Sequence, residues 1–252
     1  MNETIRTLRS LRTIHGDFTK RRISGADLQT VLDCAVRAAN ASGRQSYSIV
    51  TVSDRDKMRH LCGYAGDRLL VFCVDFTRII DLARHLGHEF TVPDIAGFVT
   101  GSTDTILAAQ TACIAARSLG IDSLFTNGIH RGSIERVFSA LELPDRHCFP
   151  LVALVLGYAG QEPPHQKGRL TGPGIVHRET YRRLTTKERE ALVAQYDDPA
   201  CHLALNEDWA KEGVRHYLDW FYTRWSRHRD TRPLWQALQK AGFVPGGESG
   251  AK

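Results

Sequence analysis

The chain has 252 residues, of which 42% are hydrophobic and 24% charged, and it contains 21 glycines and 9 prolines. These proportions exclude collagen-like and disordered chains and are typical of a globular protein. The longest uncharged apolar run, residues 148–159, is interrupted by Pro150 and Gly157 and falls short of the roughly 18 residues that a membrane-spanning helix needs. We therefore expect one core of ordinary size and no membrane span.

The charge balance favours anionic partners without naming them. Lys and Arg total 33 against 28 Asp and Glu, which gives a net charge of +5. The basic residues of positions 6–22 stand far in sequence from Lys167 and Arg169, whereas nucleic-acid-binding proteins commonly gather such side chains on one helix or tail. This distribution favours a small phosphorylated ligand, or a solvated basic surface, over nucleic acid.

The first 22 residues contain no continuous apolar stretch that could serve as a secretory signal. The six cysteines form no C-x-x-C pair, and several lie inside apolar periodic segments. Buried reduced thiols are therefore favoured over disulfides or metal ligands. We expect a cytoplasmic protein.

The expected elements alternate between helices and strands. A helix is predicted over residues 24–39, because Ser24-Gly-Ala-Asp27 is a capping pattern followed by apolar residues at helical spacing. Further elements follow in chain order, namely strand 47–52, helix 54–62, buried strand 69–74, helix 76–87, helix 104–119, strand 123–126, helix 133–141 and strand 151–156. We expect the alanine-rich helix 104–119 to be the central core helix, ending at Gly120, and Ser133 to cap the helix that follows it.

The remaining third of the chain is predicted to be irregular and then helical. Residues 157–174 form a Gly/Pro-rich loop, and long loops inside compact domains are commonly functional. Helices are expected from Thr185, over 206–225 with a broad aromatic face that needs cover, and over 231–241, before a frayed tail from Pro245. The pattern indicates a single α+β domain with a core of residues 1–184. A helical extension, residues 185–252, would pack on the core or on a partner subunit.

Several familiar sites are excluded by spacing. The sequence contains no G-x-G-x-x-G, no G-x-x-x-x-G-K-[ST], no G-x-S-x-G and no H-E-x-x-H. His85 and His88 lie one helical turn apart beside Glu89, but their order fits neither common zinc helix, so a solvated helix face is the preferred interpretation.

Four short polar clusters stand next to element boundaries. They are Arg9-Ser10-Leu11-Arg12, residues 40–46, residues 126–131 and Lys167-Gly168-Arg169. Guanidinium groups and hydroxyls suit phosphate and carbonyl oxygens, although a solvated helix end explains the first cluster equally well. Residues 40–46 hold more side-chain donors and acceptors than a tight turn needs, and Gly128 permits close backbone approach to a flat ligand.

In this order and at these separations, the clusters resemble the flavin-dependent nitroreductase family, and most closely its flavin reductase and oxygen-insensitive NADPH nitroreductase branch. The similarity extends to about Tyr181, and it includes the helix 104–120, Leu156-Gly157-Tyr158 and Arg169-Leu170. The resemblance implies a mixed, mainly antiparallel sheet wrapped by helices. It also implies an obligate homodimer with FMN at the subunit interface, which would cover the aromatic arm.

The same resemblance implies roles for individual residues. Phosphate contacts are expected from Arg9, Ser10, Lys167 and Arg169. Arg12 is expected beside flavin N1 and O2, where it would stabilise negative charge on the pyrimidine ring. Ribityl and pyrimidine contacts are expected from Asn40, Gln45 and Ser46, and contacts near N5 and O4 from Asn127, Gly128 and Ile129. Arg232 is expected to meet the NADPH phosphate, with an ordinary helix-start residue as the alternative.

Three departures from the family pattern bear on this site. Leu8 stands where the branch prefers a polar residue such as His, so one phosphate or pyrimidine contact is expected to be missing. Gly43 replaces a usual Asn, and Ser46-Tyr47 replaces Pro-Trp or Pro-Phe. Both cationic clusters are retained, so we still expect a flavin.

The expected activity is that of an FMN-dependent oxidoreductase. Hydride would pass from NADPH or NADH through flavin N5 to a nitroaromatic, quinone or flavin acceptor in a ping-pong cycle, with the chemistry supplied by the cofactor. The alternatives are a flavin-binding carrier or redox sensor without turnover, and a basic nucleic-acid-interacting protein. A family member specialised for another flavin reaction, such as dehalogenation or flavin fragmentation, is a narrower alternative.

Overall fold

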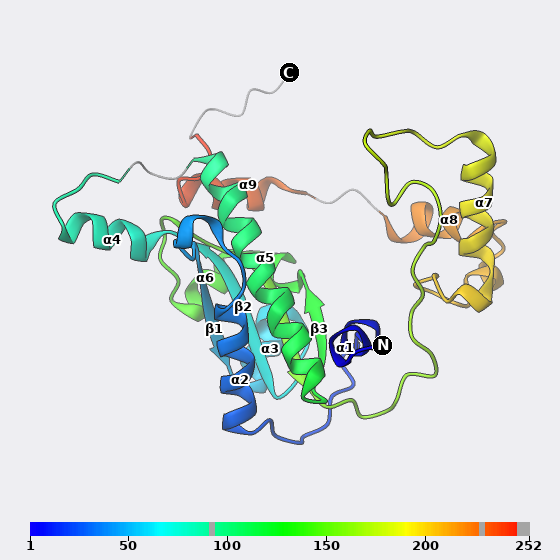
Figure 1. Cartoon of the computed structure of the whole chain (residues 1–252), viewed down its shortest axis with the longest axis horizontal. Coiled ribbons are helices and arrows are strands. Elements are labelled where there is room, and N and C mark those ends of the chain that lie inside the picture. The colour runs from blue at the N-terminus through cyan, green and yellow to red at the C-terminus, as the bar shows by residue number, and fades with distance from the viewer. Residues whose placement is uncertain (91–93, 227–229, 246–252) are drawn as a thin grey trace. The chain divides into compact units, whose positions relative to one another are not determined.

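The computed structural model describes residues 1–90, 94–226 and 230–245 (Figure 1). The chain forms two compact units, Met1–Glu162 with Thr231–Lys252 (unit 1) and Pro163–Asp230 (unit 2). The expected boundary at residue 184 falls within unit 2, and the packing of residues 185–252 on a partner stays a prediction. The expected tail after Pro245 lies outside the described residues. No helix in the described ranges combines the length and apolar character that crossing a bilayer requires.

Unit 1 is built on a four-stranded sheet. Its strands β1 (Tyr47–Val52), β2 (Arg68–Asp75), β3 (Asp122–Thr126) and β4 (Cys148–Gly157) lie in the order β1-β2-β4-β3. All three pairings are antiparallel, and an isolated parallel bridge joins Thr13 to Ser123. The expected α+β fold with a mainly antiparallel sheet is confirmed.

Strand β4 is longer than the sequence predicts, because a proline does not end it. Pro150 lacks an N–H for the ladder, and the register with β2 shifts there, so that Phe72 pairs with Val152 and Cys73 with Pro150. Leu151 is the extra residue of a bulge, a position at which a strand tolerates proline. The strand therefore begins at Cys148 and not at Leu151.

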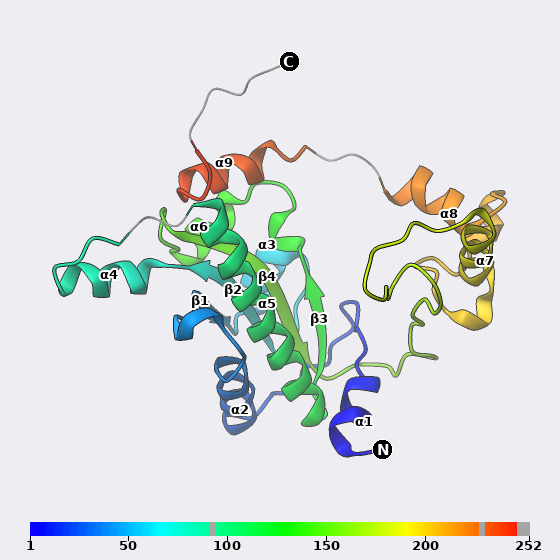
Figure 2. The same ribbon diagram turned by 45° about the horizontal axis from the view of Figure 1, so that its top comes forward.

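Helices cover both faces of the sheet. On β2, Leu69, Val71 and Cys73 point to one face, where they pack with residues of α3 (Arg55–Cys62) and α6 (Glu135–Leu141). Leu70 and Phe72 point to the other, against α2 (Gly25–Val36) and the alanines of α5 (Ile95–Ser118). Figure 2 shows α5 crossing that face of the sheet. This burial on both faces explains why β2 reads as a continuous apolar run.

The central helix begins nine residues earlier than predicted. Asp94 caps it by accepting hydrogen bonds from the N–H groups of Ala96 and Gly97. Glycines and threonines in its first half hide the apolar period. Gly101 allows a close approach, since a Cβ atom there would lie 2.7 Å from Val74 Cγ1. The helix ends before Gly120 as expected, with Gly120 at φ 72°.

Of the two predicted helix N-caps, Ser24 and Ser133, one is confirmed and one is wrong. Ser24 Oγ accepts a hydrogen bond from Asp27 N at 3.0 Å, as the capping pattern predicts. The prediction for Ser133 is wrong, because α6 is preceded by Ile134 without a side-chain cap and the Ser133 carbonyl accepts from Arg136. The remaining helices of unit 1 are α1 (Glu3–Arg9), α4 (Thr77–His85) and α9 (Arg232–Lys240), which closes at Gly242 as predicted.

Unit 2 has a small aromatic core of its own. Helix α7 (Thr186–Asp197) starts with a capping box between Thr185 and Glu188. The predicted helix over 206–225 is wrong, because Gly213 adopts φ 72° after a 3₁₀ turn and His216 restarts the chain as α8 (Tyr217–Trp220). A π-helical turn over residues 221–225 follows. Tyr217 stacks on Tyr196 and Trp220, so the aromatic side chains partly cover one another.

Candidate functional site

The first polar cluster is tied to the sheet by a buried carboxylate. Asp122 opens β3 and its side chain is only 5% exposed. It binds Arg12 through two hydrogen bonds, of 2.8 Å from Nε and 3.1 Å from Nη2, and Arg117 through one of 2.9 Å. Arg117 also donates to Ser10 Oγ at 3.1 Å. Ser10 and Arg12 are therefore fixed to the edge of the sheet by α5 and β3.

Arg12 has a second anionic partner in unit 1. Its Nη1 and Nη2 donate to the Glu162 carboxylate, whose side chain is 77% exposed. Both carboxylates raise the pKa of Arg12 above its already high ordinary value. Burial alone would raise the pKa of Asp122, but the hydrogen bonds from Arg12 and the Ala159 N–H keep it below the ordinary value. Arg12, Arg117, Asp122 and Glu162 thus form one network of ion pairs, which we call the charged knot. It joins Arg12 to two carboxylates that lie more than 100 positions later in the chain.

The Asn40–Ser46 turn is organised by another buried carboxylate. Asp104, on α5, accepts from Ala41 N at 2.8 Å and from Ser46 N at 3.3 Å. Asn40 Oδ1 accepts from Gln45 N at 3.1 Å. Part of the polar side-chain surplus seen in the sequence thus satisfies the turn itself. Gly43 has φ 66°, which glycine and asparagine both adopt readily.

Ser46 differs from its predicted neighbours in exposure. The residue is fully buried, and its hydroxyl has no hydrogen-bond partner among the described residues. Asn40 and Gln45 remain partly exposed at the turn. The three residues are therefore neighbours, as predicted, while their contacts with a ligand stay a prediction.

Gly128 follows β3 in a short 3₁₀ turn, Gly128–His130. Its N–H donates to Thr126 Oγ1 at 2.9 Å, and a Cβ atom there would lie 2.2 Å from the Cys62 carbonyl oxygen. The close approach that the glycine permits is thus to the end of α3. Ile129 is fully buried in the core, so its side chain serves packing.

A cleft of about 360 Å³ opens between α5 and the end of β3, next to this turn. Its walls are mainly apolar and two carboxamides stand among them, with the lining residues Ile106, Ala109, Gln110, Phe125, Asn127, Leu151 and Val152. Clefts of this volume and character commonly bind small ligands. Asn127 is the predicted site residue that lines it, and Gln110 and Phe125 are lining residues that the sequence analysis missed.

The knot at Asp122 and this cleft lie at opposite ends of β3. Asp122 and Asn127 are five positions apart, a span of about 17 Å in an extended strand. Arg12 binds carboxylates at the far end, and its predicted contact with a flavin pyrimidine stays a prediction. Arg9 is exposed at the end of α1, and Arg232 is exposed at the start of α9.

The loop cations lie in unit 2. Lys167 Nζ donates to the Ala204 carbonyl at 2.9 Å and pairs with Glu207. Arg169 is exposed and donates to the carbonyls of Lys167 and Gly168. Position 168 needs a glycine because the backbone of Cys201 passes close to it, and a Cβ atom there would lie 1.9 Å from the Cys201 carbonyl oxygen. Both cations have hydrogen-bond partners within unit 2, and their predicted phosphate contacts stay predictions.

Comparison with known proteins gives long matches. No established protein-family model matches the sequence. The chain is 32% identical to an FMN reductase (NADPH) of Bacillus subtilis, over 78% of this chain and 81% of that protein. It is 31% identical to an oxygen-insensitive NADPH nitroreductase of Salmonella typhimurium, over 97% and 99% respectively. The solved structure of a nitroreductase from B. subtilis superposes with a TM-score of 0.78 and 27% identity, covering 96% and 99% of the two chains.

Proposed function

The chain belongs to the nitroreductase family of oxidoreductases, in its NADPH-dependent flavin reductase and nitroreductase branch, and on that premise we propose that it binds FMN and transfers hydride from NAD(P)H to an electron acceptor. The acceptor classes are nitroaromatics, quinones and free flavins. NADPH and the acceptor would enter in turn, as in a ping-pong cycle. The six unpaired cysteines agree with a cytoplasmic location.

The observation that carries the proposal is the cleft beside Gly128. Its apolar walls suit a flat aromatic ring, and the carboxamides of Gln110 and Asn127 can donate to and accept from the polar edge of such a ring. Phe125 and Ile106 would exclude water from the ring face. Bound FMN would supply N5, the atom that takes up hydride and releases it.

We assign the phosphate end to the cationic clusters, following the family resemblance. Arg9, Ser10, Lys167 and Arg169 are each proposed as phosphate contacts, because guanidinium, hydroxyl and ammonium groups bind phosphate oxygens by hydrogen bonds, which charge strengthens. Arg232 is proposed for the phosphate of NADPH. Asp122 supports the proposed phosphate contacts of Arg9 and Ser10 indirectly, since it fixes the Ser10–Arg12 segment to β3.

We also propose a homodimer through α5. Ile95, Val99 and Ile106 lie on one face of the helix, and they are 51%, 59% and 55% exposed. Such a row of exposed apolar side chains along one helix is typical of a protein interface. The row also leads to the cleft, since Ile106 lines it.

The visible spectrum of the purified protein tests the central proposal. We expect a yellow, FMN-containing protein that bleaches when NADPH is added without oxygen. Bound flavin that does not bleach would indicate a carrier or redox sensor. A colourless protein that binds oligonucleotides, with an affinity falling steeply as salt rises, would indicate the nucleic-acid alternative.

Two variants test the phosphate assignment. Arg9→Ala and Arg169→Ala should each lose FMN on dialysis, because each removes a charged hydrogen-bond donor. Arg59→Ala is the matched control, since Arg59 is an exposed arginine on α3 paired with Asp56. Full flavin retention in both test variants would remove the assignment.

A further inference from the structure

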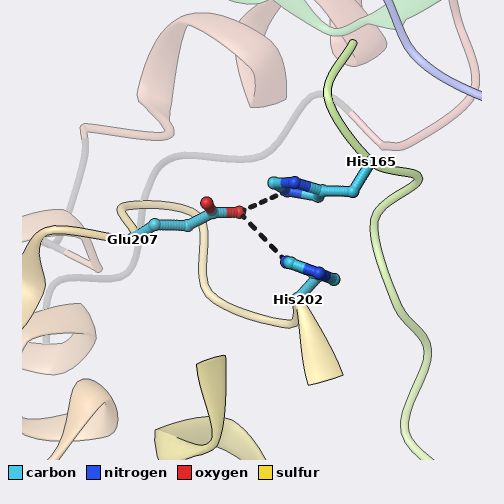
Figure 3. A group of neighbouring side chains, drawn as sticks. All are labelled: His165, His202 and Glu207. Atoms are coloured by element: carbon cyan, nitrogen blue, oxygen red, sulfur yellow. Dashed lines mark hydrogen bonds and ion pairs between the residues drawn. The ribbon is translucent and has the colours of Figure 1, made fainter. Parts of the chain in front are cut away.

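Three side chains of unit 2 meet beside Lys167, one of the residues proposed above to contact the FMN phosphate (Figure 3). Glu207 Oε1 lies 2.7 Å from His165 Nε2 and 3.9 Å from His202 Nδ1. The two imidazole rings stack with centroids 3.6 Å apart and planes 13° from parallel. Within the described residues, this is the group of three or more His, Cys, Asp or Glu side chains whose ligand atoms lie close enough to hold one ion.

The backbone holds this group in place from separate parts of the chain. His165 lies in the loop after β4, whereas His202 ends the 3₁₀ turn Pro199–Cys201 with φ 48° and ψ 37°. The His202 carbonyl accepts from Gly168 N at 3.0 Å. A left-handed histidine is uncommon and persists only where its surroundings hold it, so the backbone position of His202 is set before any ligand binds.

One nitrogen of the group lacks a hydrogen-bond partner. His202 Nδ1 is buried and has no hydrogen-bond partner within the described residues, and Glu207 Oε1 lies 3.9 Å from it. A cavity of about 100 Å³ borders His202, Glu207 and Asp198. This volume can hold two or three waters at about 30 Å³ each.

From this arrangement we propose that His165, His202 and Glu207 bind one divalent transition-metal ion of the Zn²⁺ class. Two imidazoles and one carboxylate are a common zinc ligand set that leaves a fourth position open, and the cavity can supply a water there. Tetrahedral zinc places ligand nitrogen and oxygen atoms about 3.4 Å apart. The observed nitrogen–oxygen separations of 2.7 and 3.9 Å bracket that value, and the two stacked rings would tilt so that both nitrogens point at the ion.

Lys167 is the competitor of the metal. Its ammonium donates a hydrogen bond to the same Glu207 oxygen that faces His165. A cation so close opposes a second positive charge. Replacement of Lys167 by a neutral residue should therefore tighten metal binding. If Glu207 serves only as an ion-pair acceptor for Lys167 and His165, the same replacement leaves metal binding unchanged.

The ion would also cross-link unit 2. The ligands join the loop at residue 165 to the chain between residues 202 and 207. The buried apolar core of this unit is small, with Ala204, Tyr217 and Trp220 as its buried hydrophobic residues. Binding to the folded state alone raises thermal stability by mass action.

Zinc titration of the full chain by calorimetry, with chelator-stripped protein, tests the proposal. We expect one Zn²⁺ per wild-type chain. His165→Gln, His202→Gln and Glu207→Gln should each weaken binding by at least about tenfold, and Lys167→Met should strengthen it severalfold. The control variant His85→Gln/His88→Gln removes the last residue of α4 and a histidine three positions after it, and it should bind zinc as the wild type does.

Two results would overturn the site. One is a zinc isotherm for His165→Gln/His202→Gln that equals that of the wild type, which would assign binding to other groups such as the cysteines. The other is a wild-type chain with no zinc binding and no zinc-dependent rise in melting temperature, a result that stands even where a variant fails to fold. Neither readout involves flavin or turnover, so the result is independent of the proposed function.

Discussion

Replacement of Asp122 by Asn tests whether the charged knot holds the N-terminal segment to the sheet. The carboxylate is 5% exposed, and it binds two guanidinium groups that are themselves only 18% and 22% exposed. Asn keeps the shape and one acceptor oxygen but removes the charge, so Arg12 and Arg117 lose their shared counterion.

The expected cost follows from burial. Removing one partner of a buried ion pair costs about 3–5 kcal/mol. Arg12 keeps Glu162, and the amide oxygen keeps one hydrogen bond, so we expect the lower end, about 3 kcal/mol. Glu162→Gln is the matched control on the same guanidinium. Its carboxylate is 77% exposed, and exposed pairs contribute about 0–1 kcal/mol.

Hydrogen exchange of the β4 amides, in the middle of the sheet, is the measurement. A loss of 3 kcal/mol should speed global-opening exchange about 160-fold, whereas the control should change it less than about fivefold. The sign of the pH dependence is fixed by the lowered pKa of Asp122. Its contribution is present above the unfolded carboxyl pKa of about 3.9 and is lost as pH falls through the folded value. The Asn variant should lack that acid-side loss.

Two outcomes would refute this reasoning. Equal exchange in the Asp122→Asn variant and the wild type would show that the knot contributes no stability. An equal cost for Glu162→Gln and Asp122→Asn would show that burial is not what decides the magnitude.

Two further predictions concern the turn after β3 and the cap of α7. Gly128→Ala should destabilise unit 1 by about 1–3 kcal/mol, because the new methyl group meets the Cys62 carbonyl, whereas Gly25→Ala, with open space around it, should cost less than about 0.5 kcal/mol in urea unfolding. Equal costs would remove the close-approach argument. Glu188 accepts hydrogen bonds from Arg182 and from the N-cap of α7, which lowers its pKa from 4.5 to about 2. Its stabilising contribution should be full above pH 4.5 and fall away between there and about pH 2, which NMR titration of the Glu188 carboxyl can measure, with Arg182→Ala moving the midpoint upward. A midpoint near 4.5 in the wild type would contradict the assignment.

The sequence predicted the helix starts and strands that are determined by residues close together in the chain. The Ser24 cap, the apolar run of β2 and the helix start at Thr185 all depend on residues within a few positions of one another. The prediction of one helix over 206–225 failed because the apolar period that joins Trp209 to Tyr217 takes no account of the left-handed Gly213 between them.

In the candidate site, the sequence did not reveal contacts between residues that are far apart in the chain. Asn127 was found because it stands beside a glycine at the end of a strand, and it lines the cleft. Asp104 and Asp122 were missed, because their partners lie 58 and 110 positions away and nothing nearby distinguishes them from surface acids. The buried carboxylates that fix both polar clusters become visible only in three dimensions.

Helix α9 has a consequence for synthesis. Ala237, Ala241 and Phe243 complete an apolar cluster with Phe76 and Phe149, yet all of unit 2 is translated between the sheet and this helix. At about 5–20 residues per second, a ribosome needs roughly 3–14 s to make those residues. During that interval the nascent sheet exposes aromatic side chains that its last helix has yet to cover, which makes this stretch of translation the natural moment for chaperone binding.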